Sequence, residues 1–148
     1  MRKVRFALAL TTAMMAASSA FAQSATGSPE EARAMLDKAV AAVAADKAKA
    51  LEMFTKGEGG FKDRDLYVFC GGPDGMFTAH PKLVGQSLKD LKDKAGKPIG
   101  AEMYAVAVEG KVAEVAYVWP KPDGGDPVPK VAYVTKVGDQ VCAVGYYK

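Results

Sequence analysis

The sequence is poor in the residues that metal sites and many enzymes use. Its 148 residues include one histidine and two cysteines, too few for a structural zinc site without help from carboxylates. The cysteines are far apart in the chain, so a redox-active C-x-x-C pair is excluded. A glycine-rich phosphate loop and a G-x-S-x-G nucleophile elbow are also missing. We therefore expect neither a bound metal nor a cofactor.

Catalysis by a Ser-His-Asp triad would have to recruit His80, in the stretch AHPKL. No supporting motif accompanies this histidine, and Pro81 beside it indicates a loop at the end of a strand. A hydrogen-bonding role near a pocket is the simpler interpretation. The run KDLKDK at 89–94 alternates in charge, which is typical of a solvated face. We therefore expect that the protein is not an enzyme.

Residues 1–22, MRKVRFALALTTAMMAASSAFA, have the layout of a cleavable secretory signal. A basic start precedes an apolar run, and Ala20-Phe21-Ala22 offers small residues where signal peptidase reads them. A retained transmembrane anchor is the alternative, but the run is short for a span of about 20 residues. We expect cleavage after Ala22 and a periplasmic or secreted protein.

Loss of this signal changes the charge balance. The full chain has 20 basic and 17 acidic residues, a net charge of +3, and the signal carries three basic residues and no acidic one. The remaining chain is therefore neutral overall, so the basic balance is not evidence for a nucleic-acid partner. Its length suits a single domain.

Cys70 and Cys142 are the two cysteines, and both lie in strand-like runs, LYVFC and QVCAVGYY. An exported protein meets an oxidising compartment, which favours a disulfide. A disulfide requires Cα atoms about 4.4–6.8 Å apart, which the sequence does not show. Two buried free thiols are the alternative.

Residues 23–27 are expected to form a disordered lead, followed by a long amphipathic helix. Ser28 can cap this helix, with Pro29 in its first turn and Glu31 completing a capping box. Apolar residues recur at three- and four-residue spacings from 32 to 54, and Asp46 can cap a second helix after a kink. The stripe would pack along a sheet or face a second subunit.

The remaining chain reads as strands joined by turns and short helices. Strand-like runs occur at 66–70, 76–80, 112–119, 130–137 and 140–147, with helical patterns near 87–93 and 97–110. Short turns favour antiparallel pairing, so residues 28–148 are expected to form one α+β domain. In this domain a long N-terminal helix packs on a five-stranded antiparallel sheet, with the helices against one face.

The segment 117–134, YVWPKPDGGDPVPKVAYV, contains four prolines between two strand-like ends. We expect a rigid, lid-like loop, with Trp119 and Lys130 at its base. Tyr117 and Trp119 are two apart on a strand and therefore share a face. Aromatic walls and a cation suit a site for a small anion, whereas core aromatics beside a surface lysine are the alternative.

Several ordered motifs resemble one known family, the single Cache domain of type 2 found in extracytoplasmic sensors. These motifs are ARAMLDKAVAAVAADKAKALEMF, FKDRDLYVFCGGPDGMFTAHPKLVGQSLKDLKDKAGK, VAYVWPKPDGGDPVPKVAYV and the closing VGYY. The resemblance implies a PAS-like fold with a pocket for a small molecule, often a short carboxylate. The matching ligand-binding positions are Tyr67, His80, Tyr117, Trp119, Lys130 and Tyr133.

The chain departs from this family in ending at Lys148, without a transmembrane exit or a signalling domain. We therefore expect a periplasmic ligand-binding sensor module that signals through a separate partner, such as a membrane-bound receptor or kinase. The alternative is a structural or interaction module with the same fold, which forms a homodimer through the N-terminal helix or docks a membrane partner.

Overall fold

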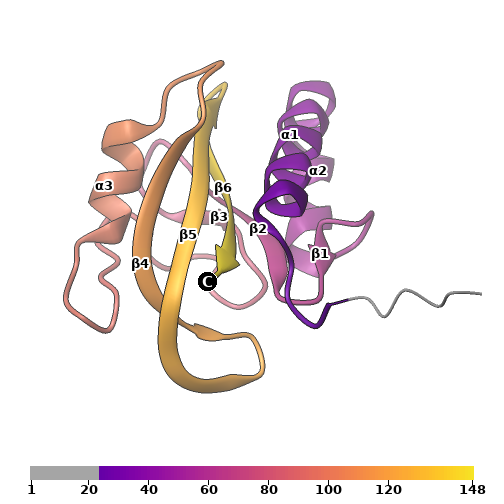
Figure 1. Ribbon diagram of the computed structural model, residues 1–148. Helices are drawn as coiled ribbons and strands as arrows, with labels where there is room; N and C mark the ends of the chain where they lie inside the picture. Colours follow the sequence, from indigo (N-terminus) through magenta and orange to yellow (C-terminus); the bar gives the residue numbers. More distant parts are fainter. Residues whose placement is uncertain (1–23) are drawn as a thin grey trace, which may run out of the picture.

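The computed structural model describes residues 24–148, so the signal expected at 1–22 lies outside the described residues. Three helices and six strands follow one another along the chain (Figure 1). They are α1 (Pro29–Ala45), α2 (Lys47–Lys56), β1 (Lys62–Asp63), β2 (Leu66–Gly71), β3 (Phe77–Ala79), α3 (Ile99–Val106), β4 (Ala113–Lys121), β5 (Gly124–Val137) and β6 (Gln140–Tyr147).

The strands form one antiparallel sheet in the order β1-β2-β6-β5-β4, and β3 also pairs with β2. The prediction of an α+β domain with an antiparallel sheet is confirmed. The sheet has six strands rather than five, because the two-residue β1 is too short to leave a sequence pattern.

The N-terminal helical segment divides at Asp46, as its capping potential predicts. Ser28 and Glu31 form the capping box of α1, and the Asp46 side chain accepts a hydrogen bond from the backbone N–H of Lys49 at the start of α2. Gly57 ends α2 in the left-handed conformation, which glycine adopts without a steric penalty. The buried positions of α1 are the apolar stripe, so the stripe packs within the chain itself.

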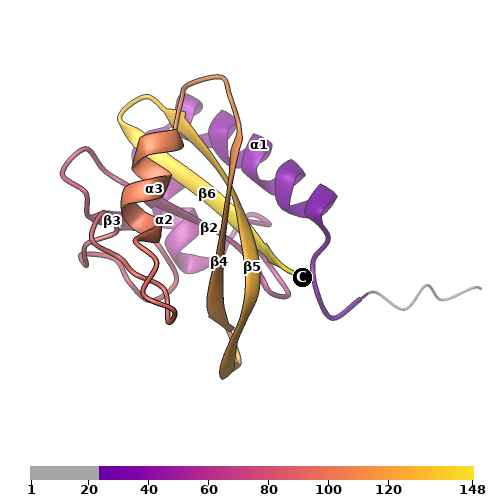
Figure 2. The same cartoon turned by 60° about the vertical axis from the view of Figure 1, so that its left-hand side comes forward.

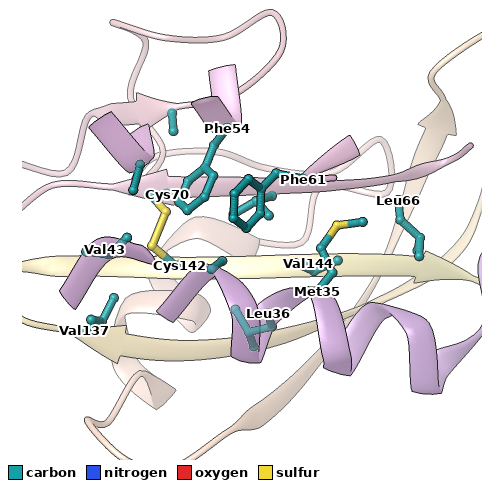
Figure 3. Close-up of a cluster of buried hydrophobic side chains, with 14 of the residues drawn as sticks. Met35, Leu36, Val43, Phe54, Phe61, Leu66, Cys70, Val137, Cys142 and Val144 are labelled. Atoms are coloured by element: carbon teal, nitrogen blue, oxygen red, sulfur yellow. A yellow bond between two sulfur atoms is a disulfide. The ribbon is translucent and has the colours of Figure 1, made fainter. Parts of the chain in front are cut away.

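The helices cover both faces of the sheet, not one face as expected. In Figure 1, α3 lies on one side of the sheet, and α1 and α2 lie on the other. Figure 3 shows the first interface, where Leu36, Phe54 and Val144 are buried among other apolar side chains. The second interface brings α3 against β4 and β5 and forms a separate apolar cluster. This second face holds the candidate site.

The segment before α3 differs from its predicted form. Residues 87–93 form turns rather than a helix, and α3 ends at Val106 instead of Gly110. Asp93, expected on a solvated face, is buried and accepts hydrogen bonds from the backbone N–H groups of Ala95, Lys97 and Val118. These bonds tie the loop to β4 and make Asp93 a structural residue.

A disulfide joins Cys70 of β2 to Cys142 of β6. The two residues are direct cross-strand neighbours, because the β2–β6 register places them opposite each other. Both are fully buried beneath α1 and α2 (Figure 3). The bond therefore links β2 and β6 within the apolar cluster that α1 and α2 cover.

The proline-rich stretch is a continuous two-stranded ribbon, which corrects the prediction of a long lid-like loop. β4 runs to Lys121 and β5 starts at Gly124, so only two residues form the turn. A register irregularity between Trp119 and Lys121 accommodates Pro120, consistent with the preference of proline for bulges. The ribbon extends beyond the rest of the sheet in Figures 1 and 2.

Residues 24–27, expected to be a disordered lead, pack against the turn before β2. Arg64 donates hydrogen bonds to the backbone carbonyls of Ser24 and Thr26, and Gly27 donates its buried N–H to Asp65. Across residues 24–148, no helix has the length and apolar character needed to cross a membrane.

Candidate functional site

An aromatic pocket lies between the sheet and α3. Its walls come from β2, β3, β4, α3 and the 80–91 loop, and they are Tyr67, Phe69, Phe77, His80, Leu83, Leu91, Ile99, Met103, Tyr117 and Trp119. The cavity inside has a volume of about 10 Å³, which is room for one water molecule. Aromatic packing fills the rest: the centroid of the His80 ring lies 5.3 Å from that of Tyr67 and 5.1 Å from that of Phe77.

A wider groove of about 390 Å³ opens outward from this pocket. Tyr67, His80 and Trp119 line both spaces, so they form the boundary between them. Lys62, Lys82 and Lys121 also line the groove, whereas no acidic residue of the described chain does. A groove with this charge pattern attracts small anions.

Lys130 lies behind the boundary, on β5, and is only 1% exposed. Its Nζ donates hydrogen bonds to the hydroxyl oxygens of Tyr67 at 3.1 Å and Tyr147 at 3.4 Å. The same atom lies 4.4 Å and 4.6 Å from the centroids of those two rings, within cation–π range. Burial lowers the pKa of Lys130 to about 7, and the negative charge of Asp65 opposes this shift.

A glycine on the neighbouring strand allows the lysine to reach this position. A Cβ added to Gly145 of β6 would lie closer than 3.0 Å to Cε of Lys130 and 3.3 Å from Cδ and Nζ. The lysine side chain therefore crosses β6 directly over Gly145 to reach Tyr67 on β2. Any larger residue at 145 would occupy its path.

The hydroxyls of Tyr147 and Tyr67 differ in whether they donate a hydrogen bond. Tyr147 donates its proton to the backbone carbonyl of Pro120 at 2.7 Å while accepting from Lys130. Tyr67 also accepts from Lys130, but it donates to no residue of the described chain. Burial raises the pKa of Tyr67 to about 12, so its proton stays in place at neutral pH. The Tyr67 hydroxyl is thus a free donor at the boundary of the groove.

His80 supplies a second donor. Its Nδ1 accepts hydrogen bonds from the backbone N–H groups of Lys82 and Leu83, at 2.9 and 3.2 Å, which places the ring proton on Nε2. Burial, followed by the charges of Lys130 and Lys82, lowers the pKa of His80 to about 4. The ring is therefore neutral at pH 7 and presents a fixed N–H donor to the site.

Five of the six predicted ligand residues gather on one face of the sheet, and Tyr133 does not. Tyr133 packs on the opposite face, against Tyr146 and the α1 side of the core. Strand alternation could have excluded it, because Tyr133 is an odd number of residues from Lys130. Tyr147 was not predicted as a site residue, although counting back from the turn at Gly138-Asp139 pairs it with Lys130.

These features define a PAS-like sensor domain, in which a small donor-lined site lies between an antiparallel sheet and its shorter helix. The chain matches the family described as Single Cache domain 2 over residues 2–145 and belongs to that family.

One relative of this chain is a chemotaxis protein. The methyl-accepting chemotaxis protein McpP of Pseudomonas putida is 39% identical over 59 residues, which cover 40% of this chain and 11% of that protein. The chain matches only about a tenth of the length of that relative.

Solved structures show the same fold. A methyl-accepting chemotaxis protein from Vibrio parahaemolyticus is 26% identical with a TM-score of 0.65, over 80% of this chain and 86% of that chain. A periplasmic sensor domain of a chemotaxis protein is 26% identical with a TM-score of 0.59, over 80% and 88%. A Cache chemosensory domain described for carboxylic acid recognition is 23% identical with a TM-score of 0.55, over 80% and 86%.

Proposed function

We propose that this chain is an extracytoplasmic sensor module that reversibly binds a short carboxylate and signals through a separate partner, a membrane-bound receptor or kinase. The observation that carries the proposal is the hydrogen-bond chain from Lys130 to Tyr67. Because the ammonium can only donate, the Tyr67 oxygen accepts and its own proton is free for a ligand. A carboxylate oxygen is the acceptor that gains most from such a charge-supported donor.

The other groups at the boundary suit the same ligand. His80 offers its Nε2–H, and the three lysines of the groove favour the approach of an anion. Trp119 and Tyr117 provide apolar surface for a short alkyl group. The ligand carboxylate would lie where the pocket meets the groove, with the Tyr67 hydroxyl between it and Lys130.

The size of the site limits the ligand. The inner cavity has room for about one water molecule, so a ligand must lie mainly in the groove or displace aromatic side chains inward. A short-chain acid fits the small inner cavity better than a long-chain acid does. The structural neighbour described for carboxylic acid recognition shares the fold with this chain, and the choice of ligand here rests on the donors.

Isothermal titration of the full chain with short monocarboxylates, and with their uncharged amides, tests the proposal. Wild-type protein is expected to bind an acid and not its amide. Tyr67→Phe removes the donor hydroxyl and keeps the ring, and hydrogen bonds to charged groups contribute about 1.5–3 kcal/mol. The dissociation constant should therefore rise about ten- to hundredfold.

Tyr133→Phe is the matched control, because it removes the same group from the opposite face of the sheet. It should leave the affinity unchanged. Equal affinities in wild type and Tyr67→Phe would remove this site from the proposal. The absence of binding across the acids at millimolar concentration would refute the proposed ligand class itself.

A further inference from the structure

Asp65 is a buried carboxylate that lines neither the pocket nor the groove. It is 6% exposed and lies in the turn directly before β2. Its Oδ1 accepts the N–H of Gly27 at 2.7 Å, whereas Oδ2 is buried and receives no hydrogen bond from residues 24–148. Buried polar atoms in folded proteins nearly always have a partner, so an unpartnered carboxylate oxygen requires an explanation.

The strand register places Asp65 in line with Lys130. Val68 lies opposite Val144, and continuing this antiparallel count places Asp65 beside Tyr147. On the other side of β6, Tyr147 lies opposite Lys130. The charge of Asp65 acts on both Tyr147 and Lys130, which fits this placement. The Lys130 side chain leans over Gly145, and its Nζ reaches the hydroxyl of Tyr67, two residues along the chain from Asp65.

We propose that Asp65 is the counter-charge of Lys130, a positioning residue that favours the protonated form of the buried lysine without touching the ligand. The two side chains do not form a direct ion pair, because Lys130 donates its hydrogen bonds to Tyr67 and Tyr147. Asp65 therefore acts on the ammonium through space. Its negative charge raises the pKa of Lys130 against the larger opposing effect of burial.

The other groups that face Lys130 do not provide this negative charge. They come from β2, β4, β6 and the end of β3, and they are Tyr67, Tyr117, Tyr147 and His80. Two charged residues near the tip of the ribbon, Lys121 and Asp123, act on Tyr147. Burial raises the pKa of the three tyrosines and lowers that of His80, so all four are neutral at pH 7. Lys121 adds positive charge, and Asp123 is exposed to solvent at the tip.

The consequence for ligand binding rests on the proposed function, whereas the charge pair itself does not. An anion binds to the protonated site, so affinity should fall as the pH rises through the pKa of Lys130. Removal of the Asp65 charge would lower that pKa and move the loss of affinity to a lower pH. Asp65 would thus set the upper pH limit of the sensor.

The first experiment needs no ligand. The side-chain resonances of lysine are followed by NMR during a pH titration of the full chain, with Lys130 assigned by its loss in Lys130→Met. Asp65→Asn keeps an oxygen for the Gly27 N–H and removes the charge. We expect its Lys130 midpoint to lie about one pH unit below that of wild type.

Asp63→Asn is the matched control, because Asp63 lies two residues away and its exposed carboxylate pairs with Arg64. It should leave the midpoint unchanged. An unchanged midpoint in Asp65→Asn would overturn the proposal. If that variant does not fold, the Asp65 Cγ resonance in wild type decides: an inflection at the Lys130 midpoint supports the pair, and a flat response refutes it.

The ligand titration is then repeated with both variants across the pH range. A lower pH limit for binding in Asp65→Asn alone is the expected result. A shifted Lys130 midpoint without binding of any carboxylate would keep the charge pair and refute the proposed function. Binding with the same pH limit in wild type and Asp65→Asn would keep the function and refute the role of Asp65.

Discussion

Gly145→Ala should weaken ligand binding while the fold stays intact. The new methyl group would lie closer than 3.0 Å to Cε of Lys130 and 3.3 Å from its Nζ, in the path that the lysine takes to Tyr67. The backbone at Gly145 is not in the left-handed region, so alanine is compatible with it. The conflict therefore falls on the end of one flexible side chain.

The geometry sets the size of the effect. Carbon atoms pack best at about 3.5–4.0 Å, so Cε must retreat by at least about 0.5–1 Å. The Nζ–Oη distance to Tyr67 is 3.1 Å and that to Tyr147 is 3.4 Å, so this retreat breaks one or both hydrogen bonds. Loss of charge-assisted support for Tyr67 should weaken carboxylate binding about ten- to hundredfold.

Stability should change little in the same variant. A compatible Gly→Ala change stabilises by about 0.4–1 kcal/mol through the unfolded chain, which offsets the displacement of the lysine. Calorimetric titration with a short carboxylate and thermal unfolding without it measure the two effects. We expect weak binding beside a melting temperature close to that of wild type.

A double-mutant cycle identifies the cause. In a Lys130→Ala background the path over residue 145 is empty, so Gly145→Ala should cause no further loss of affinity. Full affinity in the single Gly145→Ala variant would show that the position of Lys130 does not matter for binding. Equal losses in both backgrounds would show that the alanine acts elsewhere.

Two further predictions concern stability. Burial lowers the pKa of Lys130 from 10.5 to about 7, so between these pH values the unfolded chain holds one more proton than the folded chain. The free energy of unfolding should therefore rise by about 1.4 kcal/mol for each pH unit from 7 toward 10.5. Lys130→Met should remove this slope and be more stable at pH 7, as measured by chemical denaturation at pH 6–10; an unchanged slope would contradict the assignment. The Cys70–Cys142 bond closes a sequence separation of 72, so its reduction should cost about 4 kcal/mol. Thermal unfolding with and without reductant tests this value, and a Cys70→Ala/Cys142→Ala variant that still responds to reductant would contradict it.

Local signals in the sequence predicted the elements well where each signal is short-range. The capping residues Ser28 and Asp46 place both N-terminal helix starts, because a cap and its helix are adjacent in the chain. The turn at Gly138-Asp139 fixes the β5–β6 register and therefore the Lys130–Tyr147 pair. Several of the wrong predictions concern conformations that depend on partners far along the chain.

The proline-rich segment is the main example. Four prolines favour an irregular loop when the segment is considered alone, yet β4 and β5 pair through most of it because two adjacent strands satisfy each other's remaining backbone groups. Asp93 is a second case, since its burial follows from a contact with Val118, 25 residues away. Asp65 is a third, because a single acidic residue before a strand has no pattern that indicates burial.

The position of those prolines has a consequence for how the protein behaves at high concentration. Lys148 donates its N–H to the carbonyl of Pro129, and Val118 donates to Asp93 on the outer margin of β4. Closer to the tip, no other strand of residues 24–148 pairs with the ribbon, so both of its margins are open there. Open strand margins are templates for pairing with another chain. Pro120, Pro127 and Pro129 lack the N–H groups that such pairing needs, so the ribbon that forms one wall of the groove resists polymerising with its own copies.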